Sequence, residues 1–290
     1  VLGDFVIESL EINLDQLESG AWLLRGLSGG DAASVDFAGL YQSLQKIPQL
    51  SLRNVTINLH TFDGELLSFS DGLATIANRD GAHYLHANLS LADSPEEMAL
   101  SIEVTGNELA DMSGQMHVEL PHADYSELFH RQTLEDLSIG EMFGGGHFWL
   151  TFVGGELSEF TSELELDTLA LLSSASDSLS LRDLSGKVGL VRQSIDDSWE
   201  LSLSDMRLTW QELRWSPFNV YMSLKPQNSL AVRADSIDVS LIAQFAVGSG
   251  LLSESARLQL EQYAPRGKLE NFSILLPLTE NSQERMLIKT

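Results

Sequence analysis

LSLSDMRLTW, residues 201–210, alternates apolar and polar residues, inserts two polar residues, and then alternates again. Alternation with a period of two predicts a β-strand with one apolar face. The step at Ser204-Asp205 would move the apolar residues to the opposite face unless the backbone bulges or turns there. The stretch therefore predicts a strand with a local bulge or turn at its centre.

The same phrase recurs along the chain at irregular spacing, which excludes a solenoid of fixed period. Its connecting residues, such as Arg53-Asn54, Arg182-Asp183 and Glu270-Asn271, tolerate bulge geometry. We expect a mainly β fold: a long, curved, antiparallel-rich sheet that forms a groove or open gutter, with a few short amphipathic helices. The clearest further copies are Phe5, Ile7, Leu10 and Ile12; Leu50, Leu52, Val55 and Ile57; and Leu164, Leu166, Leu169 and Leu171.

Turn signals and helical periodicity divide the chain. Asp63-Gly64, Asp71-Gly72 and Asp80-Gly81 each predict a tight hairpin turn. The spacing of apolar residues predicts a helix over 36–47, short helices within 123–137 and a helical excursion over 241–263. A turn at Gly144-Gly145-Gly146 would separate a domain of residues 1–140 from one of residues 141–290, unless the chain forms one continuous domain.

Composition excludes several classes of protein. The 290 residues carry a net charge of −25, which opposes binding to nucleic acid or to an anionic membrane surface. The absence of cysteine excludes disulfides and thiolate metal sites. The sequence contains no run of about 18 apolar residues, so no membrane-spanning helix is predicted. The chain begins directly with a strand pattern, as an internal segment would.

The sequence offers no convincing catalytic motif, so we expect no enzyme, no cofactor and no metal site. No Gly-x-Ser-x-Gly motif is present. His83 and His86 are three residues apart, a spacing that places them on opposite faces of a strand. Phe148, Leu150 and Phe152 alternate after the three glycines, so no helix follows that could bind phosphate.

Three segments resemble the YhdP branch of the AsmA-like proteins: residues 201–210 with Trp215-Ser216-Pro217, residues 143–157, and residues 263–269, YAPRGKL. The resemblance covers most of residues 40–276. It implies a periplasmic segment of a longer protein that is anchored in the inner membrane of Gram-negative bacteria. It also implies a hydrophobic β-groove linked to phospholipid movement toward the outer membrane, with phospholipid and the rest of the same chain as partners.

Two hypotheses follow for the apolar face. In the first, acyl chains lie along it while headgroups remain in water, so that no single residue is essential. In the second, the same side chains form the core of a closed β-sandwich, a structural or binding module without lipid. The residues expected to line the groove are Ile57, Leu59, Leu164, Leu166, Leu169, Leu171, Leu201, Leu203, Leu208, Ile237 and Val239.

Overall fold

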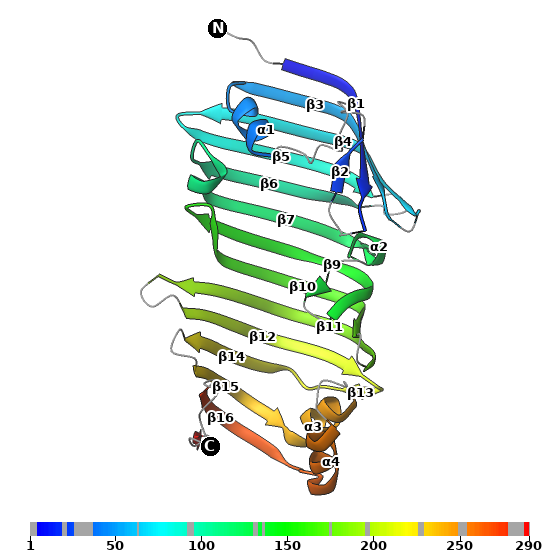
Figure 1. Ribbon diagram of the computed structural model, residues 1–290, viewed down its shortest axis with the longest axis vertical. Coiled ribbons are helices and arrows are strands. Elements are labelled where there is room, and N and C mark those ends of the chain that lie inside the picture. Colours follow the sequence, from blue (N-terminus) through cyan, green and yellow to red (C-terminus); the bar gives the residue numbers. More distant parts are fainter. Residues whose placement is uncertain are drawn as a thin grey trace. The chain divides into compact units, whose positions relative to one another are not determined.

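A computed structural model (Figure 1) describes residues 5–18, 22–25, 37–62, 64–91, 96–129, 133–134, 137–173, 176–194, 198–225, 229–248, 254–277 and 287–289. Its contacts divide the chain into two compact units. Unit 1 comprises Val1–Gln132 and Gly144–Ser158, and unit 2 comprises Thr133–Phe143 and Glu159–Thr290. The domain division predicted from the sequence stays a prediction.

The sheet of unit 1 is a meander with one parallel pair at its start. β3 to β7 follow one another as antiparallel neighbours, while β1 runs parallel to β3, with Phe5 opposite Leu50. The strands are β1 (Phe5–Gln16), β2 (Trp22–Leu24), β3 (Gln49–His60), β4 (Leu66–Arg79), β5 (Ala82–Leu91), β6 (Glu97–Thr105) and β7 (Ser113–Asp124). Both β9 (Leu137–Val153) and β10 (Glu156–Ser173) contain residues of both units.

Antiparallel pairing also builds the sheet of unit 2. It joins β10 to β11, β11 to β12, β12 to β14, β14 to β15 and β15 to β16. The strands are β8 (Thr133–Leu134), β11 (Ser176–Gln193), β12 (Ser198–Trp210), β13 (Leu213–Arg214), β14 (Phe218–Lys225), β15 (Ser229–Asp238), β16 (Lys268–Pro277) and β17 (Leu287–Lys289). The fold class is confirmed: the protein is mainly β, with an open sheet not closed into a barrel and few short helices.

Left-handed residues provide the bulges that the repeated phrase requires. Asn54, Asp183, Asp205 and Asn271 have φ angles of 51°, 50°, 52° and 53°. Asn and Asp tolerate this region better than other residues with a Cβ. The register of β12 against β14 shifts between Leu203 and Met206, across Asp205. The register also shifts beside Asn54 and Asp183, so at these three positions the bulge absorbs the extra residue.

Two predicted turns are wrong. Asp71-Gly72 lies inside β4, where Asp71 has a φ of 53° and forms another bulge rather than a hairpin turn. Gly144-Gly145-Gly146 lies inside β9. A Cβ on Gly145 would lie 2.5 Å from the carbonyl oxygen of Leu120 in β7, so this glycine permits close approach of two strands. The turn at Asp80-Gly81, with φ angles of 51° and 79°, is confirmed.

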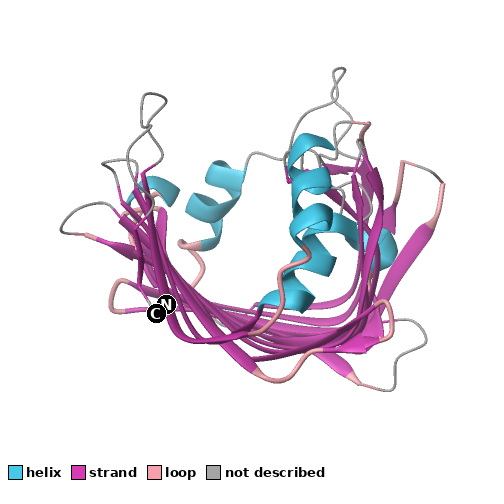
Figure 2. Cartoon of the chain, turned by 90° about the horizontal axis from the view of Figure 1, so that it is seen from below, coloured by secondary structure: helices cyan, strands magenta, loops and turns pink. Residues whose placement is uncertain are grey.

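The helices are short and lie on the inner side of the bent strands (Figure 2). α1 (Phe37–Leu44) falls inside the predicted range 36–47. α2 (Ser126–Phe129) is a single turn, and the predicted helical stretch 123–137 also contains strand β8, because Thr133 and Leu134 pair with β9. α3 (Val239–Gly248) and α4 (Glu254–Tyr263) occupy the predicted excursion, and a 3-10 turn spans Leu109–Asp111.

Candidate functional site

Apolar side chains form unbroken rows across the sheet of unit 2. One row joins five strands, from β11 to β16, through directly opposed residues. A second row runs beside it, two residues along each strand. The first row consists of Leu190, Leu201, Met222, Val232 and Ile274, and the second of Val188, Leu203, Val220, Ala234 and Phe272. Because strand residues alternate between faces, these rows lie on one side of the sheet.

The bulge at Asp205 continues this apolar face toward the end of β12. Met206, Leu208 and Trp210 follow it, and Trp210 lies opposite Leu181 of β11. A similar step occurs in β10, where Leu166 opposes Leu184 and Leu169 opposes Leu181. The face therefore extends along the strands as well as across them.

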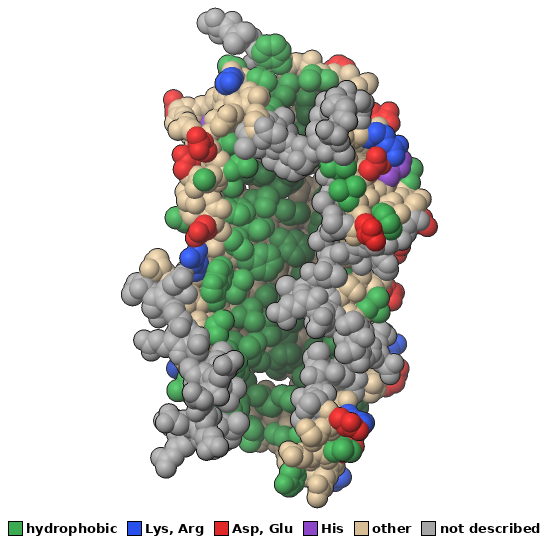
Figure 3. Space-filling model, viewed as in Figure 1, with side chains coloured by type: hydrophobic (Ala, Val, Ile, Leu, Met, Phe, Trp, Pro, Cys, Tyr) green, Lys and Arg blue, Asp and Glu red, His purple; other side chains and the backbone are tan. Residues whose placement is uncertain are grey.

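Most of these side chains are half-buried rather than buried. Leu166 and Met206 are 4% and 6% exposed, whereas Leu201, Leu203 and Leu208 each retain intermediate exposure. Leu224, opposite Leu230 on the same face, is 46% exposed. Figure 3 shows hydrophobic side chains gathered on the hollowed face of the sheet in each unit. An apolar face that its own unit covers only in part presents surface to an apolar ligand.

Unit 1 repeats the arrangement on a smaller scale. Ile57 and Leu59 of β3 lie on its apolar face, with Leu59 9% exposed and Ile57 half-buried. Opposed residues again form rows across the strands. One row consists of Leu50, Ile76, Leu85, Ile102 and Met116. The sheet of unit 1 therefore presents the same chemistry as that of unit 2.

The structure places the predicted groove residues as follows. Ile57 and Leu59 belong to unit 1, and the other nine belong to unit 2. In β10, Leu164, Leu166, Leu169 and Leu171 lie opposite Gly186, Leu184, Leu181 and Leu179 of β11. Ile237 lies opposite Leu269. Val239 is not on the strand, because the Asp238 carboxylate accepts hydrogen bonds from the amides of Ser240 and Leu241 and so starts α3.

Aromatic side chains hold α3 over the apolar face of unit 2. The ring of Phe245 packs edge-on against Trp210, with 5.3 Å between centroids, and against Trp215, with 5.9 Å. Trp210 is only 3% exposed. Large aromatic residues thus close part of the face, while the two rows of β11 to β16 remain half-buried except at Ala234, which is buried.

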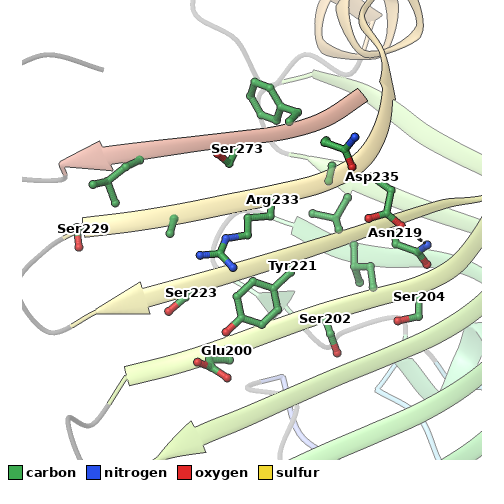
Figure 4. A pocket seen from close by; sticks show the side chains of 17 residues that line it. Glu200, Ser202, Ser204, Asn219, Tyr221, Ser223, Ser229, Arg233, Asp235 and Ser273 are labelled. Atoms are coloured by element: carbon green, nitrogen blue, oxygen red, sulfur yellow. Dashed lines mark hydrogen bonds between the residues drawn. The ribbon is translucent and has the colours of Figure 1, made fainter. Parts of the chain in front are cut away.

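The opposite face of unit 2 is polar and carries a shallow pocket (Figure 4). Tyr221 and Arg233 oppose each other in its wall. Burial, together with a hydrogen bond to Glu200, raises the pKa of Tyr221. Asn219 links the bulge of β12 to β15, because it accepts a hydrogen bond from the amide of Asp205 at 2.7 Å and donates one to Asp235 at 2.7 Å. One face of β12 is therefore polar and the other is apolar.

Histidines on the polar side of unit 1 form a cluster that the sequence did not predict. Nδ1 of His147 lies 3.4 Å from Nε2 of His117, and Trp149 stacks near both rings. In contrast, His83 bonds Asn78 and His86 bonds Ser101, consistent with opposite faces of β5. Within the described ranges, no group of three or more His, Asp or Glu residues is arranged to hold a metal ion.

The fold and the apolar face define an open β-sheet protein that offers a half-buried hydrocarbon-like surface. The chain belongs to the YhdP protein family, whose model matches residues 1–290. The YhdP family is not a known family of enzymes. Neither the curated proteins nor the solved structures contain a match to this chain. Among the described helices, none combines the length and the hydropathy needed to cross a bilayer.

Proposed function

We propose that the chain is a periplasmic segment of a longer, inner-membrane-anchored protein, and that it binds phospholipid acyl chains on its apolar sheet face during lipid transport toward the outer membrane. Membership of the YhdP family, a family related to lipid transport, supports this proposal. The observation that carries it is the pair of five-residue apolar rows of unit 2, in which every side chain except the buried Ala234 stays half-buried.

Energetics favours a hydrocarbon ligand over a polar one. Each methylene group removed from water contributes about 0.8 kcal/mol, so about ten methylenes contribute about 8 kcal/mol. This gain is comparable with the cost of immobilising a ligand, which lies between about 4 and 15 kcal/mol. Because no charged side chain belongs to the two rows, the contacts select acyl chains by area rather than by a specific polar group.

The polar side of the same strands is suited to contact with water rather than with lipid. Ser202 and Ser204 alternate with Leu201 and Leu203 along β12 and line the polar pocket. A net charge of −25 opposes docking of the protein surface onto an anionic bilayer. Lipid would therefore enter along the apolar face rather than by adsorption of the whole chain to a membrane.

The alternative of a closed β-sandwich receives less support. A sandwich would press a second sheet onto the rows of unit 2 and bury Leu201 and Leu203 as core. Instead, both side chains remain partly exposed. The sheet is open and not closed on itself.

The test compares Leu203→Asp with Ser202→Asp in lipid-binding measurements. Both changes add one carboxylate to β12, but only the first places it on the apolar face. Native mass spectrometry of untreated and delipidated protein should show phospholipid bound to the parent chain and to Ser202→Asp, and little bound to Leu203→Asp. Equal masses before and after delipidation of the parent protein would refute the proposal.

A further inference from the structure

We propose that His117 and His147 bind a zinc ion on the polar side of the unit 1 sheet. The two histidines come from β7 and β9, which pair in the sheet. Their facing nitrogens, Nε2 of His117 and Nδ1 of His147, are 3.4 Å apart. Both rings are half-buried, and the planes of the two rings differ by 4°.

The separation of these nitrogens fits a shared tetrahedral ion. Zinc bonds imidazole nitrogen at about 2.0–2.1 Å, so two ligands at a tetrahedral angle stand about 3.3 Å apart. A square-planar ion would require a shorter separation, of about 2.9 Å. The observed distance therefore favours zinc, with water in the two remaining positions.

A zinc ion can replace the hydrogen bond between the two imidazole rings without a change in the number of bound protons. In the neutral pair, one ring donates its N–H to the lone pair of the other. When the donor ring adopts its other tautomer, its proton moves to the nitrogen that faces away, and both facing lone pairs become available to the ion. No net proton is released from two neutral imidazoles, whereas a protonated ring would have to lose its proton first.

The surroundings favour a cation. Glu119 lies two residues from His117 on the same face of β7, and Glu103 lies two residues from Ser101, which opposes His117. His86 also faces this side, where its Nδ1 is 3.0 Å from the Ser101 hydroxyl. Trp149 covers the pair from one direction, with its ring 5.0 Å from that of His117 and 5.7 Å from that of His147. The two carboxylates raise the local cation concentration.

The experiment titrates the untagged parent chain with zinc chloride by isothermal calorimetry. We expect one ion per chain, and we expect His117→Ala and His147→Ala each to weaken binding at least about tenfold, the scale of loss that even indirect partners of a ligand produce. His86→Ala is the matched control, because it removes an imidazole from the same face, and it should change affinity less than about twofold.

A second measurement does not depend on folded variants. In the parent protein, zinc should shift the imidazole ¹⁵N resonances of His117 and His147 in a long-range ¹H–¹⁵N spectrum and leave those of His86 unshifted. Binding should also weaken when the pH falls from about 7.5 to about 5.5, because zinc requires neutral imidazole. Absence of saturable binding, or shifts confined to other histidines, would overturn the proposal.

Discussion

Val55 of β3 faces Gly72 of β4, and a Cβ on Gly72 would lie 2.8 Å from both the Cβ and the carbonyl oxygen of Val55. It would also lie 2.7 Å from Cδ2 of Leu89. The bulged strands β3 and β4 therefore meet here with no room for a side chain, and Leu89 of β5 fills the remaining space. This contact fixes how the bulges of unit 1 stack.

Gly72→Ala should destabilise unit 1 by about 1–3 kcal/mol, because the added methyl group overpacks a contact with backbone atoms that cannot move aside. Urea unfolding measures the loss. Thr75→Ala is the control, since Thr75 is exposed on the same strand, and its effect should stay within about 0.5 kcal/mol. Equal stability of Gly72→Ala and the parent chain would contradict the close contact.

Asn54 tests the left-handed bulge itself. Asn54→Val should cost about 1–2 kcal/mol, because a β-branched residue is unfavourable at a φ of 51°. Asn54→Gly should leave the free energy of unfolding nearly unchanged or increase it. Because Asn54 is exposed, loss of packing does not explain a difference between the two variants. Equal effects of Val and Gly in denaturant unfolding would count against the bulge.

Phe245 tests the attachment of α3 to the sheet. Phe245→Ala should remove the contacts with Trp210 and Trp215, cost about 2 kcal/mol and accelerate hydrogen exchange of the α3 amides. Gln244→Ala changes the neighbouring exposed residue and should leave exchange unaltered. Unchanged exchange in Phe245→Ala would show that other contacts hold the helix.

We expect the free energy of unfolding to depend on alkaline pH because of Tyr125. Its hydroxyl donates to the carbonyl oxygen of Pro121 at 2.7 Å, and burial, with a smaller effect of Glu96, raises its pKa from 10.0 to about 12. The raised pKa means that this stabilisation is complete below pH 10 and is lost as the pH rises through about 12.

The difference in tyrosinate absorbance between the parent chain and Tyr125→Phe reports this titration. We expect the difference to develop near pH 12 and the variant to lose about 1 kcal/mol at neutral pH, the value of one hydrogen bond. A titration of Tyr125 near its ordinary pKa would show that the hydroxyl is accessible to water.

The sequence predicted strands with an apolar side and a central bulge in unit 2, because both features depend on local patterns. Alternation in residues 201–210 indicated the face, and Ser204-Asp205 indicated the bulge, which the φ of 52° at Asp205 confirms. Both features are properties of a single strand and its backbone preferences. The open sheet, which depends on many such strands, was accordingly predictable.

Features that depend on a neighbouring strand were not predictable. Gly72 and Gly145 indicated conformational freedom, but the close partners that require them, Val55 and Leu120, come from other strands. His117 and His147 are separated by 30 positions and meet only through the pairing of β7 with β9. Val239 is the first residue of a helix because Asp238 caps that helix. Capping by Asp238 is an alternative to continuing the strand, and the strand pattern alone does not distinguish the two.

The most direct measurement of lipid binding is photo-crosslinking from single positions of the sheet. A photoreactive residue would replace Leu169 or Leu203 on the apolar face, and Ala170 or Ser202 on the polar face, in cells that express the chain in its natural compartment. We predict phospholipid adducts, identified by mass spectrometry, at Leu169 and Leu203 and not at Ala170 and Ser202. Adducts of equal yield on both faces, or none at the two leucines, would contradict the account.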